Sequence, residues 1–352
     1  MTSEPEILFE RRGAAGVVTL NRPQALNAVT LIMVRALHQQ LDKWRDDPTV
    51  TRVVITGSGG RAFSAGGDLR QVYELGRSGR QDEALIYRRE EYALNNAIKH
   101  YPKPYVALLD GIVMGGGVGV SVHGSHRLAG DKFLFAMPEV GIGFFPDVGA
   151  TWFLPRMPGE LGTFCAVTGE RLGSADAVSG GIATHRVSSS DIPKLIDTLC
   201  EATPVDQVVA AHARAPEVGP IISRRAAIDR TFAVDSIEGI LANLDGEAGT
   251  GQRDAQWAED TAATIRSRSP TSVKLALAQV RWGRGRSFAE CMRAEFRIVS
   301  RIVYDHDFYE GVRALIIDKN NQPRWRPATL AEVADKDIER YFLPVEHELQ
   351  LP

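Results

Sequence analysis

Two acidic side chains, Glu139 and Asp147, stand in a stretch of sequence, residues 136–149, that otherwise consists of apolar residues, glycine and proline. Apolar surroundings remove water from a carboxylate and raise its pKa, which suits a general base or a general acid. Pro138 and Pro146 argue against a continuous helix, so we expect an irregular turn to present both acids. The spacing alone also fits two solvated loop acids without a catalytic role.

Two glycine-rich segments, residues 63–69 and 111–119, each follow a short apolar run, at 53–56 and 105–109. Small residues at a strand-to-helix junction allow backbone N–H groups to point at a ligand oxygen without obstruction by a Cβ atom. Two such loops can supply the converging donors of an oxyanion hole for acyl transfer. The same glycines would also allow mere close packing of helix on strand.

Other catalytic motifs are not supported. No lysine follows either glycine-rich segment in the spacing of a phosphate-binding loop, and Ser121 lacks the closing glycine of a nucleophile elbow. None of the histidines has the spacing of a metal site, so we interpret His123 and His126 as structural. The charged run at residues 88–96, taken alone, is typical of the solvated face of a helix.

The elements that must position these residues alternate between strand and helix. We expect a β-hairpin at 6–20, helices at 30–44 (with Thr30 as N-cap) and 83–99, and strands at 53–56, 105–109 and 132–135. This order implies crossover units with helices packed on a sheet, an α/β fold. Beyond residue 190 the sequence favours helices, so we predict a core at 1–190 and a mostly helical region at 191–352.

Composition excludes several classes of protein. The 352 residues carry a formal net charge of −3 without a basic block, which argues against nucleic acid as a partner. The three cysteines are widely spaced, so neither a disulfide framework nor a zinc site is indicated. The N-terminus is acidic, and no apolar run approaches the roughly 20 residues needed to span a bilayer. We therefore expect a cytoplasmic protein that does not associate with membranes.

In this order the segments resemble the crotonase superfamily, also called the enoyl-CoA hydratase/isomerase superfamily. The matching segments are residues 20–28, 63–68, 115–117 and 138–139. The resemblance implies a spiral of ββα units with a helical C-terminal region, and an acyl-CoA substrate with no further cofactor. It places the thioester oxygen against the N–H groups of Ala65 and Gly116. It also implies that Gly66, Gly67 and Asp68 help to bind the substrate, and that a homo-oligomer (trimer or hexamer) can form.

One departure from the superfamily pattern bears on the reaction. Hydratases of this superfamily carry two catalytic glutamates, and Gly119 occupies the place of the first. Residues 115–124, 135–139 and 143–149 instead resemble the 3-hydroxyisobutyryl-CoA hydrolase subfamily, thioesterases of valine breakdown. That resemblance implies Glu139 and Asp147 as the catalytic pair.

The subfamily resemblance also assigns Glu91 to the substrate pocket, against the solvated-face interpretation of its helix. There Glu91 would accept a hydrogen bond from a 3-hydroxyl group of the acyl chain. Glu139 would either activate water or attack the thioester to form a mixed anhydride, and both routes need it ionised. Two alternatives remain at this point: hydration or isomerisation of an enoyl-CoA with Glu139 as sole base, and acyl-CoA binding without catalysis.

Overall fold

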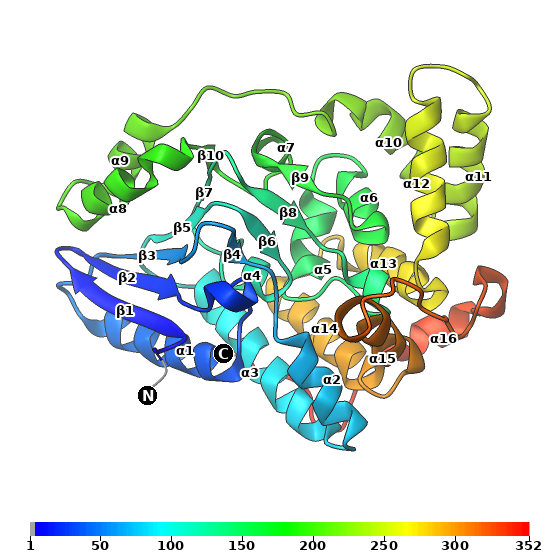
Figure 1. Ribbon diagram of the computed structural model, residues 1–352, viewed down its shortest axis with the longest axis horizontal. Helices are drawn as coiled ribbons and strands as arrows, with labels where there is room; N and C mark the ends of the chain where they lie inside the picture. The colour runs from blue at the N-terminus through cyan, green and yellow to red at the C-terminus, as the bar shows by residue number, and fades with distance from the viewer. Residues whose placement is uncertain (1–3, 352) are drawn as a thin grey trace. The chain divides into compact units, whose positions relative to one another are not determined.

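The computed structural model describes residues 4–351 (Figure 1). The chain forms two compact units, each built from three stretches of sequence. The first, here called the sheet unit, comprises Met1–Asp68, Glu90–Phe135 and Leu172–Ile222. The second, the helical unit, comprises Leu69–Arg89, Ala136–Arg171 and Ser223–Pro352. These units differ from the division at residue 190 that the composition predicted, although only helices and loops follow Arg186 in the described residues.

The strands of the described residues lie in the sheet unit, apart from the last residue of β8. They are β1 (Ile7–Arg12), β2 (Ala15–Leu20), β3 (Arg52–Gly57), β4 (Ala62–Ser64), β5 (Tyr105–Leu109), β6 (Ile112–Met114), β7 (His126–Ala129), β8 (Leu134–Ala136), β9 (Leu172–Gly173) and β10 (His185–Arg186). The helices of this unit are α1 (Leu31–Asp46), α4 (Gly116–Gly119), α7 (Ser174–Ser179), α8 (Ile192–Cys200) and α9 (Val205–His212). Helix α3 (Gln81–Lys99) is divided between the units after Arg89.

The strands form two sheets. The larger has the order β1-β2-β3-β5-β7-β10 and the smaller the order β4-β6-β8-β9. Strands β1 and β2 pair antiparallel as the predicted hairpin, while β2, β3, β5, β7 and β10 pair in parallel. Each of β3, β5 and β7 is followed directly by a short strand of the smaller sheet and then by helix. This repetition is the ββα spiral, so the predicted fold class is confirmed.

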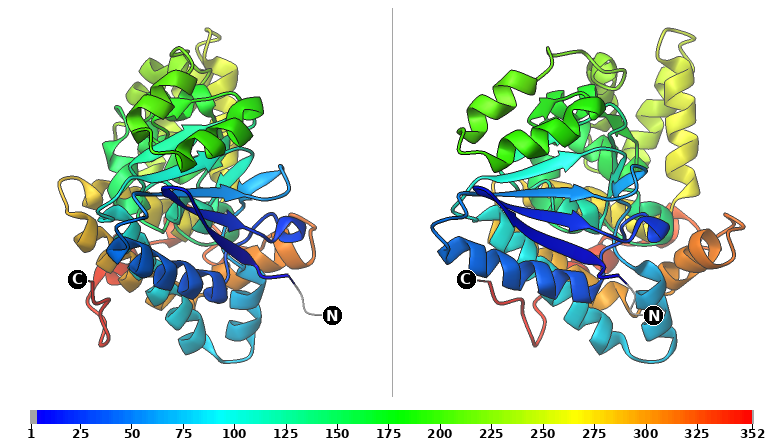
Figure 2. Two further views of the ribbon diagram at one scale, coloured as in Figure 1. Left: turned by 90° about the vertical axis from the view of Figure 1, so that its left-hand side faces the viewer. Right: turned by 60° about the vertical axis from the view of Figure 1, so that its left-hand side comes forward.

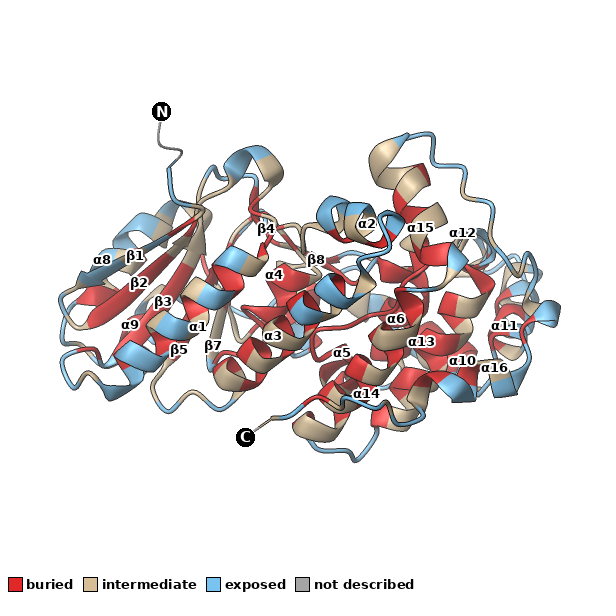
Figure 3. Ribbon diagram, turned by 90° about the horizontal axis from the view of Figure 1, so that it is seen from below, coloured by how far each residue is buried: buried red, intermediate tan, exposed pale blue. Residues whose placement is uncertain are grey.

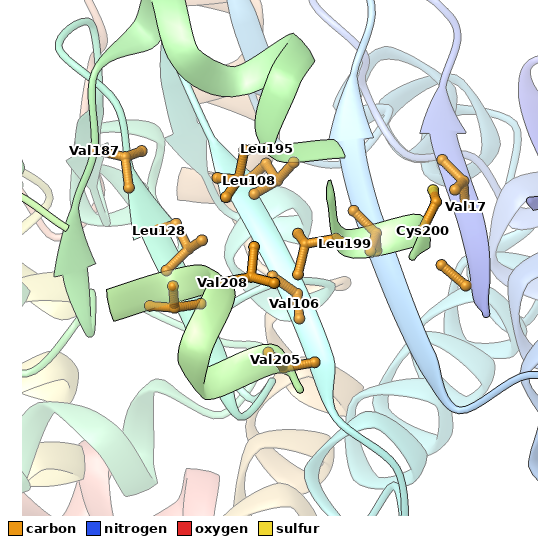
Figure 4. Packing of buried hydrophobic residues seen from close by; sticks show 13 residues of the cluster. Val17, Val106, Leu108, Leu128, Val187, Leu195, Leu199, Cys200, Val205 and Val208 are labelled. Atoms are coloured by element: carbon orange, nitrogen blue, oxygen red, sulfur yellow. The ribbon is translucent and has the colours of Figure 1, made fainter. Parts of the chain in front are cut away.

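Helices cover both faces of the larger sheet (Figure 2). On one face, strand residues such as Val106 and Leu108 pack against Leu195 of α8 and Val208 of α9 in a single buried cluster (Figure 4). Full burial of such a side chain contributes roughly 1.5–3 kcal/mol. On the other face, α1 lies so close to β2 that a Cβ atom at Gly16 would clash with the indole of α1.

The helix predicted from Thr30 onward is confirmed. The Thr30 hydroxyl accepts a hydrogen bond from the Met33 N–H group, which caps α1, and Val34, Leu37 and Leu41 point into the core. The helical spacing of these apolar residues is therefore what fixes the buried face of α1.

The helical unit is built around α13, which packs against α5, α6, α11 and α16. Its helices are α2 (Leu69–Arg77), α5 (Ala150–Phe153), α6 (Leu161–Thr168), α10 (Arg225–Phe232), α11 (Ile237–Ala248), α12 (Ala255–Ser267), α13 (Pro270–Gly283), α14 (Phe288–Ile302), α15 (His306–Val312) and α16 (Asp335–Glu339). Figure 3 shows the buried faces of α13 and α14. In the described residues, no helix combines the length and hydrophobicity needed to cross a membrane.

Candidate active site

Glu139 begins a short 3-10 turn, Glu139–Ile142, in the helical unit, and is 6% exposed. Its Oε2 atom has no hydrogen-bond partner among the described residues. Burial, followed by the negative charge of Asp147, raises the pKa of Glu139 well above the ordinary value for a glutamate. A buried carboxylate with a free oxygen and a high proton affinity is suited to take a proton from water.

The turn that carries Glu139 is fixed on several sides. The Phe144 N–H group donates to the Glu139 carbonyl at 3.0 Å, and the Ser269 N–H group at the start of α13 donates to the Val140 carbonyl at 3.4 Å. Gly143 has a φ of 68° and lies so close to α15 that a Cβ atom there would be 2.1 Å from the Asp307 carbonyl oxygen. The irregular turn predicted from Pro138 is therefore present and held rigidly.

Asp147 is 2% exposed and forms an ion pair with Arg88 of α3, with Nη1 and Oδ2 3.2 Å apart. The Arg88 guanidinium also lies over the Phe144 ring, 5.2 Å from its centroid. The positive charge of Arg88 lowers the pKa of Glu139, against the larger effects of burial and of Asp147. The two predicted catalytic acids thus share the helical unit with a buried cation.

Sequence reasoning missed Arg88 because it treated the charged run of α3 as solvated. In the structure Arg88, Glu91 and Asn95 are all buried. Their spacing of three and four residues places them on one stripe of α3 together with the buried Tyr92. Polar residues at the helical spacing of a buried residue such as Tyr92 were the sequence signal that could have revealed these three side chains.

The backbone directly after Asp147 adopts an unusual conformation. Val148 has a φ of 53°, a value that β-branched residues rarely adopt, and Gly149 has a φ of 93°. Such a conformation costs about 1–3 kcal/mol and persists only where surrounding contacts enforce it. Here Glu295 of α14 enforces it, since its carboxylate accepts the N–H groups of Gly149 and Thr151, each at 2.8 Å. No sequence signal drew attention to Glu295.

The charges of Asp147 and Arg88 beside Glu139 predict how catalysis depends on pH. A catalytic role for Glu139 requires its ionised form, and burial raises its pKa, so such a role predicts that kcat falls on the acid side at a pH well above 4.5. Replacing Arg88 by Met removes the charge that lowers this pKa, so the acid limb of the kcat–pH profile should move to higher pH. The matched control is Arg89→Met, which removes the neighbouring guanidinium that lies over Phe296 instead. An acid limb that both variants leave unmoved would show that Arg88 does not act on Glu139.

The two glycine-rich loops of the sheet unit lie directly against each other. A Cβ atom at Gly117 would be 2.4 Å from the Ser64 carbonyl oxygen, and one at Gly116 would be 3.2 Å from the Gly67 nitrogen. Glycine is therefore required at these positions of α4 for close approach. The predicted convergence of the two loops is confirmed.

The N–H groups available at this junction differ from the predicted pair. The Ala65 N–H group donates to the Leu26 carbonyl at 2.9 Å, so it is occupied within the chain. The N–H groups of Gly67 and Gly116 donate to no backbone carbonyl in the part of the chain that the structure describes. The difference arises because the Ala65 N–H group is already bonded to the segment at residues 20–28. The prediction that the Ala65 N–H group serves as an oxyanion donor is therefore corrected.

Glu91 lies beside these amide groups. It is fully buried, and its Oε1 atom would be 2.8 Å from a Cβ atom at Gly116. The predicted substrate-binding glutamate and the glycine donors are thus neighbours within the sheet unit. The arrangement places a hydrogen-bond acceptor next to potential oxyanion donors.

Gly66 and Asp68, also predicted to bind substrate, have contacts within the sheet unit. The Gly66 carbonyl accepts the Val29 N–H group at 2.8 Å, and the Asp68 carboxylate pairs with Arg22 at 3.3 Å. The buried Asn27 amide donates to the carbonyls of Ser58 and Ala62, each at 2.9 Å. These bonds explain the motif at residues 20–28, which anchors the first glycine-rich loop.

The predicted residues therefore fall into two groups. Glu139 and Asp147 lie in the helical unit, while Glu91, Gly116 and the loop at 65–68 lie in the sheet unit. Among residues 4–351, no cluster of three or more His, Cys, Asp or Glu side chains could hold a metal ion. Each group suits a chemistry of its own: the buried acids of the helical unit suit proton transfer, and the N–H groups of the sheet unit suit stabilisation of negative charge on oxygen.

Comparison with known proteins identifies similar chains. The family model described as enoyl-CoA hydratase/isomerase matches residues 15–342. The chain is 46% identical to "3-hydroxyisobutyryl-CoA hydrolase, mitochondrial" of Danio rerio, an alignment that covers 96% of this chain and 89% of that protein. It is 43% identical to the protein of the same name from Homo sapiens, with 96% and 88% covered.

Two solved structures are also similar. A protein described as a carnitinyl-CoA dehydratase from Mycobacterium thermoresistibile has a TM-score of 0.93 and 41% identity, with 99% of each chain covered. A protein described as an enoyl-CoA hydratase from Rhodobacter sphaeroides has a TM-score of 0.89 and 35% identity, with 97% of this chain and 98% of that chain covered. The similar proteins thus carry the names both of hydrolases and of enzymes that add or remove water.

Proposed function

Because the chain belongs to the enoyl-CoA hydratase/isomerase family, we propose that it is a thioesterase that hydrolyses 3-hydroxyisobutyryl-CoA to 3-hydroxyisobutyrate and CoA. The observation that carries the proposal is the buried pair Glu139 and Asp147, combined with Gly119 at the position where a hydratase of this family has its other glutamate. The names of the relatives from Danio rerio and Homo sapiens support the same reaction.

The N–H groups of Gly67 and Gly116 polarise the thioester carbonyl in this proposal. Gly67 takes the role first expected of Ala65, whose N–H group is bonded to Leu26. Two preorganised donors stabilise the oxyanion as it forms, and the loss of one such donor typically costs about 10²–10³-fold in kcat. The departing thiolate has a pKa near 8.5 and therefore needs little help from an acid.

Glu139 supplies the other half of the reaction. As a general base it takes a proton from water while the water oxygen bonds to the carbonyl carbon, and the C–S bond then breaks to release the thiolate. As a nucleophile its carboxylate oxygen bonds to the carbonyl carbon, the C–S bond breaks to release the thiolate, and water opens the resulting mixed anhydride in a second step. Asp147 orients the water in the general-base route, and in the nucleophilic route it orients the water or accepts its proton.

Hydration of an enoyl-CoA is the second candidate, favoured by the descriptions of the two similar solved structures. In that reaction Glu139 is the sole base and no thiol is released. Incubation with crotonyl-CoA and a thiol reagent distinguishes the two. Loss of the enoyl absorbance without free thiol identifies a hydratase, whereas a chain that leaves the enoyl absorbance unchanged but releases thiol from 3-hydroxyacyl-CoA is a thioesterase.

Glu91 is proposed to select substrates that carry a 3-hydroxyl group. A hydrogen bond to a charged acceptor contributes roughly 1.5–3 kcal/mol, so Glu91→Ala should reduce the preference for 3-hydroxyisobutyryl-CoA over isobutyryl-CoA by about 10–100-fold. The measurement is kcat/KM for both thioesters. The matched control is Glu90→Ala, which removes the adjacent carboxylate that pairs with Arg35. Equal preference in wild type and Glu91→Ala would refute this role.

We propose that the chain needs no cofactor beyond the CoA of its substrate, that it acts in the cytoplasm, and that it assembles as a homo-oligomer such as a trimer or hexamer. Light scattering on the eluting peak of a size-exclusion column would measure the assembled mass.

A further inference from the structure

Glu295 is a buried acid with no part in the mechanism above. It lies on α14, is fully buried, and directs one carboxylate oxygen to the N–H group of Gly149 and the other to that of Thr151. These two donors follow Asp147 by two and four residues. The carboxylate therefore holds the chain directly after the proposed catalytic acid.

Gln279 of α13 holds the same turn from its other end. Its Nε2 group donates to the Pro146 carbonyl, immediately before Asp147, and to the Thr151 hydroxyl at 2.7 Å. The side chain of Gln279 is fully buried, as is that of Glu295. Hydrogen bonds from two helices thus fix the backbone on both sides of Asp147.

The turn needs such support because its own sequence does not favour it. A β-branched residue such as Val148, with a φ of 53°, prefers an extended or right-handed conformation when it is free. Release of the turn would allow Val148 to relax and Asp147 to move away from Arg88. A displacement of about 1 Å in a catalytic group can cost about 10²-fold in rate.

We propose that Glu295 is a positioning residue of the thioesterase, which acts with Gln279 to lock the Pro146–Thr151 backbone and thereby to aim Asp147. The inference rests on the proposed function, because it assumes that Asp147 serves the hydrolytic reaction. Neither Glu295 nor Gln279 is assigned a contact with the substrate.

The charge of Glu295 gives this role a pH signature. Burial raises the pKa of Glu295 to about 8, with a further increase from Asp147 and an opposing decrease from the two backbone donors. The other titratable and charged groups of this neighbourhood are Glu139, Arg88 and, on α14 itself, Cys291. The ionised carboxylate accepts both N–H groups more strongly than the protonated acid, so the turn should be held more tightly above pH 8, although burial of the charge makes the folded chain as a whole less stable there.

Glu295→Gln tests the proposal. Glutamine keeps the size of the side chain but presents an NH2 group to one of the two backbone donors. We expect kcat to fall about 10–100-fold with KM changed less than about threefold, because the turn moves while the substrate contacts remain. The kcat–pH profile of the wild type should show a rise near pH 8 that Glu295→Gln lacks.

The same group predicts the pH dependence of stability. Since the pKa of Glu295 is about 8 in the folded chain and near 4.5 when unfolded, the folded state binds more protons between these values. The stability contributed by protonated Glu295 is therefore complete below pH 4.5 and is lost as pH rises through 8. Urea unfolding should show this decline in the wild type, and a smaller decline in Glu295→Gln.

Asp176→Asn is the matched control. Asp176 is also buried and its carboxylate also accepts two backbone N–H groups, those of Ile221 and Ile222, at 3.0 and 2.9 Å. It lies in α7 of the sheet unit, whereas the Asp147 turn belongs to the helical unit. Its substitution should lower stability but leave kcat and the rise near pH 8 unchanged.

Gln279→Met is the second test and decides the question if Glu295→Gln does not fold. It removes the donor to the Pro146 carbonyl without changing any charge, so kcat should fall about tenfold while the rise near pH 8 remains. Unchanged kcat in whichever of the two variants folds would overturn the inference. If Glu139→Gln and Asp147→Asn retained wild-type rates, the proposed function itself would fail, which is a separate result.

Discussion

Glu139→Gln should lower kcat for thioester hydrolysis by about 10³–10⁴-fold. General base catalysis by a positioned side chain contributes about 10²–10⁴-fold, and a glutamine can neither take a proton from water nor attack the carbonyl carbon. The substitution keeps the shape of the side chain and removes a buried carboxylate whose Oε2 atom has no partner among the described residues. Thermal unfolding should therefore occur at the wild-type temperature or above it.

Glu160→Gln is the control for this change of charge. Glu160 also lies in the helical unit, where its carboxylate pairs with Arg281 and Arg284, each at 2.7 Å. Its loss should leave kcat within about twofold of wild type, because neither partner belongs to the proposed mechanism. A Glu139→Gln variant with the kcat of Glu160→Gln would remove Glu139 from the reaction.

Asp147→Asn should lower kcat by about 10²–10³-fold, less than Glu139→Gln, because asparagine can still orient water through one oxygen but cannot accept its proton. The acid limb of the kcat–pH profile should also move to lower pH, since the negative charge of Asp147 raises the pKa of Glu139. Arg88 loses its buried partner, so the variant should be less stable than wild type.

The direction in which the acid limb of the kcat–pH profile moves separates a catalytic role of Asp147 from a merely structural one. Thermal unfolding reports the loss of the ion pair with Arg88, whereas the acid limb reports the charge next to Glu139. A less stable variant whose acid limb and kcat match wild type would show that Asp147 only supports the fold.

Much of the fold could be predicted because the sequence features that specify it lie within short stretches of the chain. The hairpin of β1 and β2 follows from alternating apolar residues around a glycine turn, and α1 from a capping threonine and helical spacing. The turn at residues 136–149 was predicted for the same reason, since Pro138 and Pro146 exclude a continuous helix locally. Apolar neighbours in the sequence of Glu139 were also a fair guide to its burial.

The parts that could not be predicted depend on contacts between distant residues. Glu295 and Gln279 lie more than 120 residues after the turn that they hold, as their hydrogen-bond partners show. Arg88 was missed because a charged residue on an apolar helical stripe resembles a surface residue until its buried partner is known. Ala65 was assigned from the family resemblance, and the sequence cannot say which N–H group of a loop already has a carbonyl partner.

The family alone does not decide the reaction. Similar chains carry the names of hydrolases in the curated relatives and of a dehydratase and a hydratase in the solved structures. A hydratase mechanism with two glutamates needs a carboxylate at position 119, where this chain has glycine. Hydrolysis needs one base and an oxyanion site, the roles proposed for Glu139 and for the N–H groups of Gly67 and Gly116.

Release of free thiol from 3-hydroxyisobutyryl-CoA, followed continuously with a thiol reagent, tests the central claim most directly. The proposed function predicts one thiol for each thioester consumed, at a rate that Glu139→Gln reduces by about 10³-fold or more. Absence of thiol release by the wild-type chain, or release that Glu139→Gln leaves unchanged, would contradict it.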